Sequence, residues 1–129
     1  MRQELKRIYR NYIDALNDRR LDDLDEFVHD RLVYNGEEMT REQYAAMLAE
    51  DVRVIPDLHY DIDLFVADDH QVSARLWFDC SPQGSFLGIP LDGRPISFAE
   101  HVFYRLHEGR IDQVWSLLDK EAIRDQGAG

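Results

Sequence analysis

The spacing of apolar residues changes near Pro56, and this change constrains the fold more than any other feature of the chain. Upstream of Pro56, apolar residues recur at steps of three and four, the spacing of one face of an α-helix. Downstream, apolar and polar residues alternate, the spacing of a β-strand with one buried face. Helices followed by strands predict an α+β domain in which helices cover one face of an antiparallel sheet.

Three helices are expected in the first half of the chain. Residues 3–17 carry apolar side chains along one side, with charged residues between them. Residues 17–30 show a similar pattern and predict a second, shorter helix. Thr40 is followed three residues later by Gln43, a capping-box pattern, which predicts a third helix over residues 41–52.

About four strands are expected in the second half. Residues 58–66 and 72–78 alternate in polarity on either side of the turn-like segment "ADDH", which predicts an antiparallel hairpin. In the first of these strands the even-numbered residues, from Leu58 to Val66, are expected to face the core. Residues 96–106 and 110–119 are expected to form a second hairpin.

The loop between the last two strands decides which of their residues face each other. A three-residue loop over residues 107–109, with Gly109 in the left-handed region, places Glu100 opposite Ser116. A two-residue loop would instead place Glu100 opposite Leu117. Both alternatives predict that Glu100 approaches the last strand.

Size and charge narrow the classes of function. The 129 residues suit one domain, residues 1–129, and the net charge of −11 disfavours nucleic acid and anionic membrane surfaces as partners. No apolar stretch approaches the roughly 20 residues of a membrane span, so a cytoplasmic location is expected. Cys80 is the only cysteine and is interpreted as a buried hydrophobe, with a reactive thiol as the alternative. The final "QGAG" is expected to be disordered.

Glu100 interrupts an otherwise apolar row. The even-numbered residues from Ile96 to Leu106 are all apolar or aromatic except this one. An ionised carboxylate on a buried face is costly unless it finds hydrogen-bond donors. Two interpretations stay open: a structural acid held by a buried donor, or an acid or base in a pocket. His101 projects to the opposite face, so the adjacent pair cannot act together.

The opposite row of the same sheet is aromatic. Four residues on that face predict a homodimer interface, with simple local packing as the alternative; they are Trp77, His101, Phe103 and Trp115.

Several segments resemble one protein family. "PDLHYDIDLFVADDHQVSARLWF", "GSFLGIPLDGRPISF" and "FYRLHEGRIDQVWSLLD" follow "YIDALNDRRLDDLDEFVHD" in this order, from Leu5 to Gln126. The chain thereby resembles the SnoaL-like polyketide cyclases, also called ester cyclases, of the nuclear transport factor 2-like superfamily. The resemblance implies a cone of three N-terminal helices against a curved antiparallel sheet, with an internal cavity and a dimer through the outer sheet face.

The resemblance also implies an activity. Family cyclases use an acid just after a G-K-I-x-x-x-x segment for acid and base catalysis without metal or cofactor. Aligned on Gly109, Arg110 and Ile111, that position is Ser116 here. The missing acid leaves Glu100 as the candidate catalytic residue, with Tyr34, Tyr104 and Ser116 orienting a carbonyl or hydroxyl. The remaining candidate substrate-binding residues are Val102, Tyr12, His29 and Phe78.

The expected function is therefore cofactor-independent cyclase, isomerase or hydrolase chemistry on a small apolar or polycyclic carbonyl-type ligand. A noncatalytic ligand-binding protein and a dimeric accessory protein of the same fold are the alternatives. The five histidines show no metal-ligand spacing, so no metal is expected. Asp119 is interpreted as the N-cap of a short last helix, with a substitute catalytic acid as the alternative.

Overall fold

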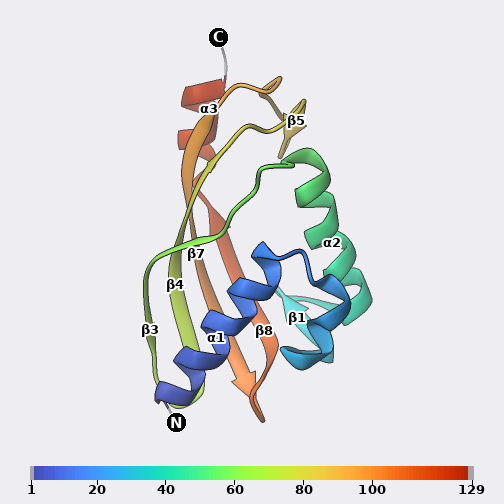
Figure 1. Cartoon of the computed structure of the whole chain (residues 1–129), viewed down its shortest axis with the longest axis vertical. Helices are drawn as coiled ribbons and strands as arrows, with labels where there is room; N and C mark the ends of the chain where they lie inside the picture. Colours follow the sequence, from blue (N-terminus) through green and yellow to red (C-terminus); the bar gives the residue numbers. More distant parts are fainter. Residues whose placement is uncertain (1, 128–129) are drawn as a thin grey trace.

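The computed structural model describes residues 2–127 as an α+β fold in which helices pack on a six-stranded sheet (Figure 1). The strands lie in the order β2-β1-β8-β7-β4-β3, and a separate two-stranded ribbon joins β5 to β6. Along the chain the elements are α1 (Arg2–Asn17), the 3₁₀ helix η1 (Leu21–Glu26), β1 (Val28–Tyr34), β2 (Glu37–Thr40), α2 (Arg41–Val54), β3 (Asp61–Ala67), β4 (Gln71–Cys80), β5 (Ser85–Phe86), β6 (Ile89–Pro90), β7 (Ile96–His107), β8 (Arg110–Leu118) and α3 (Lys120–Gly127).

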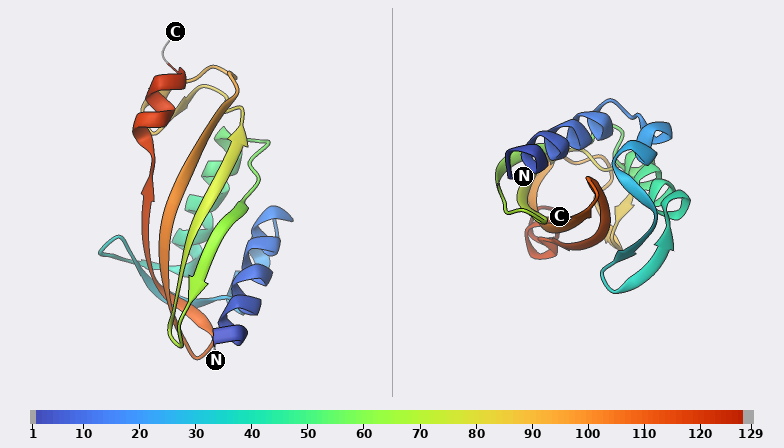
Figure 2. Two further views of the ribbon diagram at one scale, coloured as in Figure 1. Left: turned by 90° about the vertical axis from the view of Figure 1, so that its left-hand side faces the viewer. Right: turned by 90° about the horizontal axis from the view of Figure 1, so that it is seen from below.

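The sheet is curved, and the two long helices pack on its concave side (Figure 2). Seen from below, α1 runs across the open side of the curve that the strands describe, and α2 lies at its edge beside β1 (Figure 2). α1 packs against β3 and β4, whereas α2 packs against β1 and η1. Helices and sheet thereby enclose one apolar core, as the change of period near Pro56 predicts.

The expectation of a wholly antiparallel sheet is wrong, because β1 runs parallel to β8. All other neighbouring strands in the sheet are antiparallel. The second predicted helix is also wrong, since residues 17–30 contain only the short η1 before β1 begins at Val28. Leu21 and Leu24 are three residues apart, a step that suits a 3₁₀ helix as well as an α-helix. The backbone beyond Phe27 pairs with β8 and β2 instead of continuing the helix.

The first and third predicted helices are confirmed. The capping box of α2 is complete, because the Thr40 hydroxyl accepts from the Gln43 backbone N–H and the Gln43 side chain accepts from the Thr40 backbone N–H. Tyr44 and Leu48 are buried on the side of α2 that faces the core. The capping box fixes where α2 starts and thus which residues it presents to the sheet.

A β-bulge at Asp63 reverses the predicted orientation of β3. Ile62 pairs with Leu76, but Leu64 pairs with Arg75, so Asp63 is the extra residue. Leu64 and Val66 are therefore exposed, contrary to the expectation from alternation. Phe65 turns inward instead, and its ring centroid lies 5.6 Å from that of Tyr9.

The β7–β8 hairpin is confirmed, but both predicted registers are wrong. Its loop has two residues, Glu108 and Gly109, both with positive φ (53° and 77°), between paired His107 and Arg110. A bulge next to Arg105 then shifts the register again. Glu100 consequently faces Leu118, and Ser116 is its diagonal neighbour on the same face of the sheet.

The end of the chain is ordered through Gly127. Asp119 is the predicted N-cap of α3, since its Oδ1 accepts from the Ala122 backbone N–H at 3.1 Å. The expected disorder of "QGAG" is wrong for Gln126, whose side chain bonds both backbone groups of Ser97, and for Gly127, which is buried. The last two residues of that segment lie outside the described range. Cys80 is buried and burial raises the pKa of its thiol to about 12, as expected of a structural cysteine.

No helix within residues 2–127 combines the length and the apolar character needed to cross a lipid bilayer.

Candidate functional site

A pocket of about 70 Å³ lies between α1, α2 and the inner face of the sheet. Its walls come from both helices, the segment between α2 and β3, and strands β1, β4, β5, β7 and β8. The aromatic residues of the wall are Tyr12, Tyr34, Tyr44, Tyr60, Phe78, Phe86, Phe98 and Tyr104, and the acids are Glu100 and Asp51. The aliphatic residues are Leu16, Met47, Leu48, Ile55, Leu58, Val102, Val114 and Leu118.

Glu100 reaches the pocket because it occupies the inward row of β7. Its Oε2 accepts a hydrogen bond from the Ser116 hydroxyl, which β8 holds at the diagonal position. Burial raises the pKa of Glu100 to about 7; the bond from Ser116 opposes this rise, and the nearby Asp51 carboxylate adds to it. At neutral pH this carboxyl group can therefore both accept and release a proton.

Asp51 is a second acid on the pocket wall, and it is not among the residues expected there from the sequence. Burial, with a smaller contribution from Glu50, raises its pKa to about 6. Asp51 lies seven residues after Tyr44 and three after Leu48, so it falls on the buried side of α2. An acid on the apolar side of a helix is the same kind of signal that identifies Glu100 on its strand.

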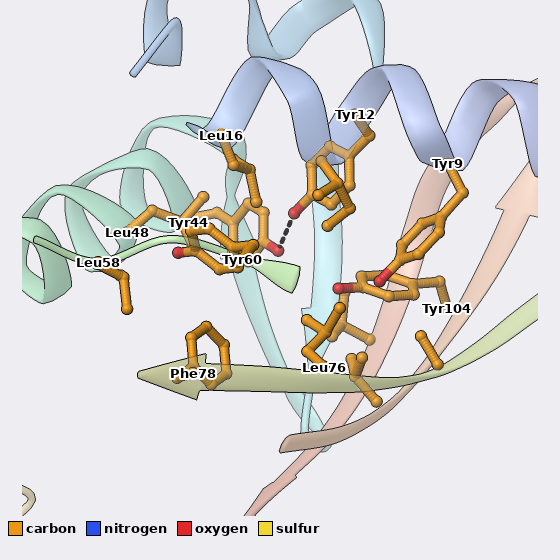
Figure 3. Close-up of a cluster of buried hydrophobic side chains, with 14 of the residues drawn as sticks. Tyr9, Tyr12, Leu16, Tyr44, Leu48, Leu58, Tyr60, Leu76, Phe78 and Tyr104 are labelled. Carbon is orange, nitrogen blue, oxygen red and sulfur yellow. Dashed lines mark hydrogen bonds between the residues drawn. The ribbon is translucent and has the colours of Figure 1, made fainter. Parts of the chain in front are cut away.

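Neutral phenols surround the two acids. The hydroxyls of Tyr12 and Tyr44 are hydrogen-bonded at 2.6 Å, from α1 to α2 (Figure 3). The ring centroid of Tyr104 lies 5.8 Å from that of Tyr12 and 5.1 Å from that of Tyr9. Burial raises the pKa of each of these four phenols well above the usual value. Each therefore keeps its proton at neutral pH and can donate a hydrogen bond.

Asn35 fixes the position of Ser116, although no motif in the sequence marks it. Its side-chain NH₂ donates to the Ser116 carbonyl at 3.2 Å, and its Oδ1 accepts from the Ser116 N–H at 2.8 Å. Asn35 has a positive φ of 48° in the turn between β1 and β2. The preceding residue, Tyr34, lines the pocket; burial raises the pKa of its phenol, while its interaction with Ser116 opposes the rise.

The structure brings six of the eight candidate site residues to the pocket wall. They are Glu100, Tyr34, Tyr104, Val102, Tyr12 and Phe78.

The other two candidate site residues are not part of the pocket wall. Ser116 adjoins it through its bond to Glu100. His29 lies elsewhere, because β1 places its Nε2 2.7 Å from the backbone oxygen of His107 at the β7–β8 turn. The expectation that His29 lines the pocket depended on a helix over residues 17–30, which does not form.

The four predicted interface residues all lie on the outer face of the sheet. Phe103 and Trp115 are directly paired across β7 and β8 and are exposed. His101 is exposed, and its Nε2 lies 2.8 Å from Nη1 of Arg75, whose guanidinium also stands over the Trp77 ring. Among the described residues, no group of three or more His, Cys, Asp or Glu side chains is arranged to hold a metal ion.

The fold and the pocket define a small α+β domain with an acid-containing, aromatic cavity inside a curved sheet. The chain belongs to the SnoaL-like polyketide cyclase family, whose model matches residues 6–127, and it has the nuclear transport factor 2-like fold. The match covers every residue of the pocket wall.

Solved structures agree with this assignment. A SnoaL-like polyketide cyclase from Agrobacterium tumefaciens is 42% identical, with a TM-score of 0.93 and coverage of 95% of this chain and 96% of that one. TsrD from Streptomyces laurentii (23% identity, TM-score 0.86, coverage 98% and 96%) and IdmH from Streptomyces antibioticus (20%, 0.82, 95% and 96%) share the fold. No curated protein sequence matches the chain.

Proposed function

We propose that the chain is a cofactor-independent enzyme that moves a proton on a small carbonyl compound bound in the pocket, with Glu100 as the acid and base. The observation that carries the proposal is the position of Glu100 in an otherwise apolar and aromatic wall, bonded to Ser116. In the family resemblance Ser116 occupies the position of the cyclase acid. Glu100 is its diagonal neighbour and supplies a carboxylate at nearly the same place.

The chemistry uses groups that are present in the wall. The Glu100 carboxylate takes a proton from the carbon next to a carbonyl group, and the electron pair moves onto the carbonyl oxygen as an enolate. A neutral phenol such as Tyr34 or Tyr104 stabilises that oxygen by donating a hydrogen bond. The protonated Glu100 then returns the proton to another atom of the same molecule, so the product is an isomer and Glu100 regains its charge.

The pocket volume favours a small substrate. A cavity of about 150 Å³ accommodates one benzene molecule in other proteins, so about 70 Å³ holds only a few non-hydrogen atoms. A polycyclic substrate requires wall residues to move outward. Small carbonyl compounds are therefore the first substrates to test.

The proposal is tested by deuterium exchange. A panel of small ketones, esters and β-dicarbonyl compounds is incubated with the protein in D₂O, and loss of the proton next to the carbonyl is followed by NMR. We expect at least one compound to exchange faster with protein, and Glu100→Gln to slow that exchange by about 10²–10⁴-fold. Glu37→Gln, which removes an exposed acid from β2, is the matched control. Unchanged exchange in Glu100→Gln contradicts the assignment.

A noncatalytic binding protein remains the second candidate function. It is favoured by the same small, mostly apolar wall, which suits ligand binding without any reaction. A compound that binds at the pocket in NMR titrations and shows no exchange over days would support this alternative.

A further inference from the structure

The charged groups of the pocket wall all have the same sign. Glu100 and Asp51 are its two ionisable acids, and no Lys, Arg or His is among its wall residues. An anionic ligand would enter a low-dielectric space next to two carboxyl groups, which repel it. A neutral ligand gains nothing from either charge, whereas a cation gains from both.

Two arginines near the end of α2 are engaged by other groups: Arg53, two residues after Asp51, and Arg19, which bonds the segment that follows the helix. Arg53 forms a bidentate pair with Glu50, at 2.8 and 2.6 Å. Arg19 donates to backbone carbonyl groups, including those of Leu16 and Leu58. Within residues 2–127 the Asp51 carboxylate has neither a hydrogen-bond donor nor an ion-pair partner. It is thus a half-buried acid with no internal counterion.

The position of Asp51 on α2 is unfavourable without a ligand. It lies in the last turn of the helix, where the partial charge of the helix dipole is negative, and its backbone oxygen accepts from the Ile55 N–H. An ionised carboxylate at this end of the helix is repelled by the negative partial charge of the helix dipole. Asp51 and Ile55 both belong to the pocket wall, so this negative end borders the cavity. A bound cation would relieve the repulsion.

Aromatic rings complete a site suited to a cation. Eight of the wall residues are Tyr or Phe, drawn from α1, α2, β1 and several further strands. Ring faces attract ammonium groups electrostatically, and the attraction is stronger where water is excluded. Aromatic rings combined with carboxylates form the usual surroundings of a bound ammonium group.

We propose that the pocket binds its ligand through a protonated basic nitrogen, held between Asp51, Glu100 and the surrounding aromatic rings. The inference rests on the proposed function in one respect, because it takes the same pocket as the substrate site. The substrate is then a small amino-substituted carbonyl compound, or a longer one whose ammonium end occupies the pocket. Asp51 acts as the ammonium anchor, which leaves Glu100 free for proton transfer.

Three unreactive probes with the same tert-butyl group separate the effects of charge and shape. They are tert-butylammonium, tert-butanol and pivalate, which are cationic, neutral and anionic at neutral pH. Binding to the full chain is followed by methyl NMR shifts of the wall residues Leu48, Val102 and Val114. We expect millimolar binding of tert-butylammonium, at least about tenfold weaker binding of tert-butanol, and no shift with pivalate.

Substitutions on α2 assign the effect to Asp51. Asp51→Asn keeps the shape of the side chain and is expected to weaken tert-butylammonium binding about tenfold while leaving tert-butanol binding unchanged. Glu42→Gln removes an equal charge from the exposed first turn of the same helix, away from Asp51, and should change neither. Circular dichroism of both variants checks that the fold is retained, and Asp51→Glu supplies a second variant that keeps the charge and should keep the binding.

Any one of four results would overturn the inference. Pivalate could bind as tightly as tert-butylammonium, or tert-butanol could do so. It could also be that none of the probes binds, or that Asp51→Asn and Glu42→Gln have equal effects. None of these probes has a carbonyl carbon with an exchangeable neighbouring proton. The experiment can therefore fail while deuterium exchange through Glu100 succeeds, and the reverse also holds.

Discussion

Glu100 and Asp51 hold their protons to a higher pH in the folded chain than in the unfolded one. Burial is the largest cause for both, and it raises their pKa values from 4.5 to about 7 and from 3.8 to about 6. Between about pH 4 and 7 the folded state therefore binds more protons than the unfolded state. The two acids make their full contribution to the free energy of unfolding at a pH below their pKa values in the unfolded chain. That contribution is lost as the pH rises through their pKa values in the folded chain.

Removing the ionisable group should flatten this dependence. We expect Glu100→Gln to be more stable than the parent chain at pH 8 by about 1–3 kcal/mol, and to lose that advantage near pH 4.5. Urea unfolding at the two pH values measures the difference, with Glu37→Gln as the control for a lost surface charge. An advantage of the same size at both pH values would show that ionisation is not its cause.

Only some of the individual residues of the site can be predicted from the sequence. Glu100 is visible because a strand alternates strictly, so a single acid in the inward row is conspicuous. Asp51 is less visible, because it directly follows the exposed acid Glu50 near the charged end of α2, and helical spacing marks the buried side less sharply than strict alternation does. The contribution of Asn35 depends on a turn with positive φ that brings it beside Ser116, 81 residues away, and no local pattern reports this contact.

Among the elements, α2 has the most influence on the site, because it presents Tyr44 and Asp51 to the pocket. Its start is fixed by the Thr40 capping box. Thr40→Ala is expected to lower the free energy of unfolding by about 1 kcal/mol, since the Gln43 N–H loses its acceptor. Thermal or urea unfolding measures the loss.

Thr40→Ser is the matched variant, because it keeps the hydroxyl acceptor and should retain most of the stability. Equal losses in the two variants would mean that the methyl group of Thr40, and not its cap, is responsible.

Helices and hairpins that follow from the spacing of residues along the chain are predicted well. Strands that form by pairing with a distant segment of the chain are not. α1, α2 and the β3–β4 and β7–β8 hairpins follow from helical periodicity, a capping box and alternation. β1 is missed because its partner β8 lies about 80 residues away and its own sequence has few alternating positions. The bulges at Asp63 and beside Arg105 add one residue each to a strand, which no count of polarity reveals.

For the whole molecule, the bulge at Asp63 enlarges the apolar outer face. Val66 pairs with Ser73, and this row continues through Phe103 to Trp115. The next row begins at Leu64 and ends at Leu117, with Arg75 and His101 between them. Leu117 is 74% exposed and Phe103 is 51% exposed. Exposed large apolar side chains with a few polar groups among them are typical of a surface that binds another protein.

We propose that this outer face joins two copies of the chain. Light scattering at micromolar concentration should give twice the chain mass of 15.2 kDa, and Phe103→Ser combined with Trp115→Ser should give a monomer. Leu87→Asn, at an exposed apolar residue outside the sheet, is the control and should leave the dimer intact. A parent chain that stays monomeric contradicts the proposal.

The tyrosines and the tryptophans lie in different parts of the molecule. All six tyrosines lie in or directly against the pocket wall, Tyr9 through its contacts with Tyr12 and Tyr104, whereas both tryptophans lie on the outer sheet face. Tryptophan fluorescence thus reports the outer surface, and tyrosine absorbance reports the interior. One unlabelled sample can follow self-association and ligand entry as two independent optical signals.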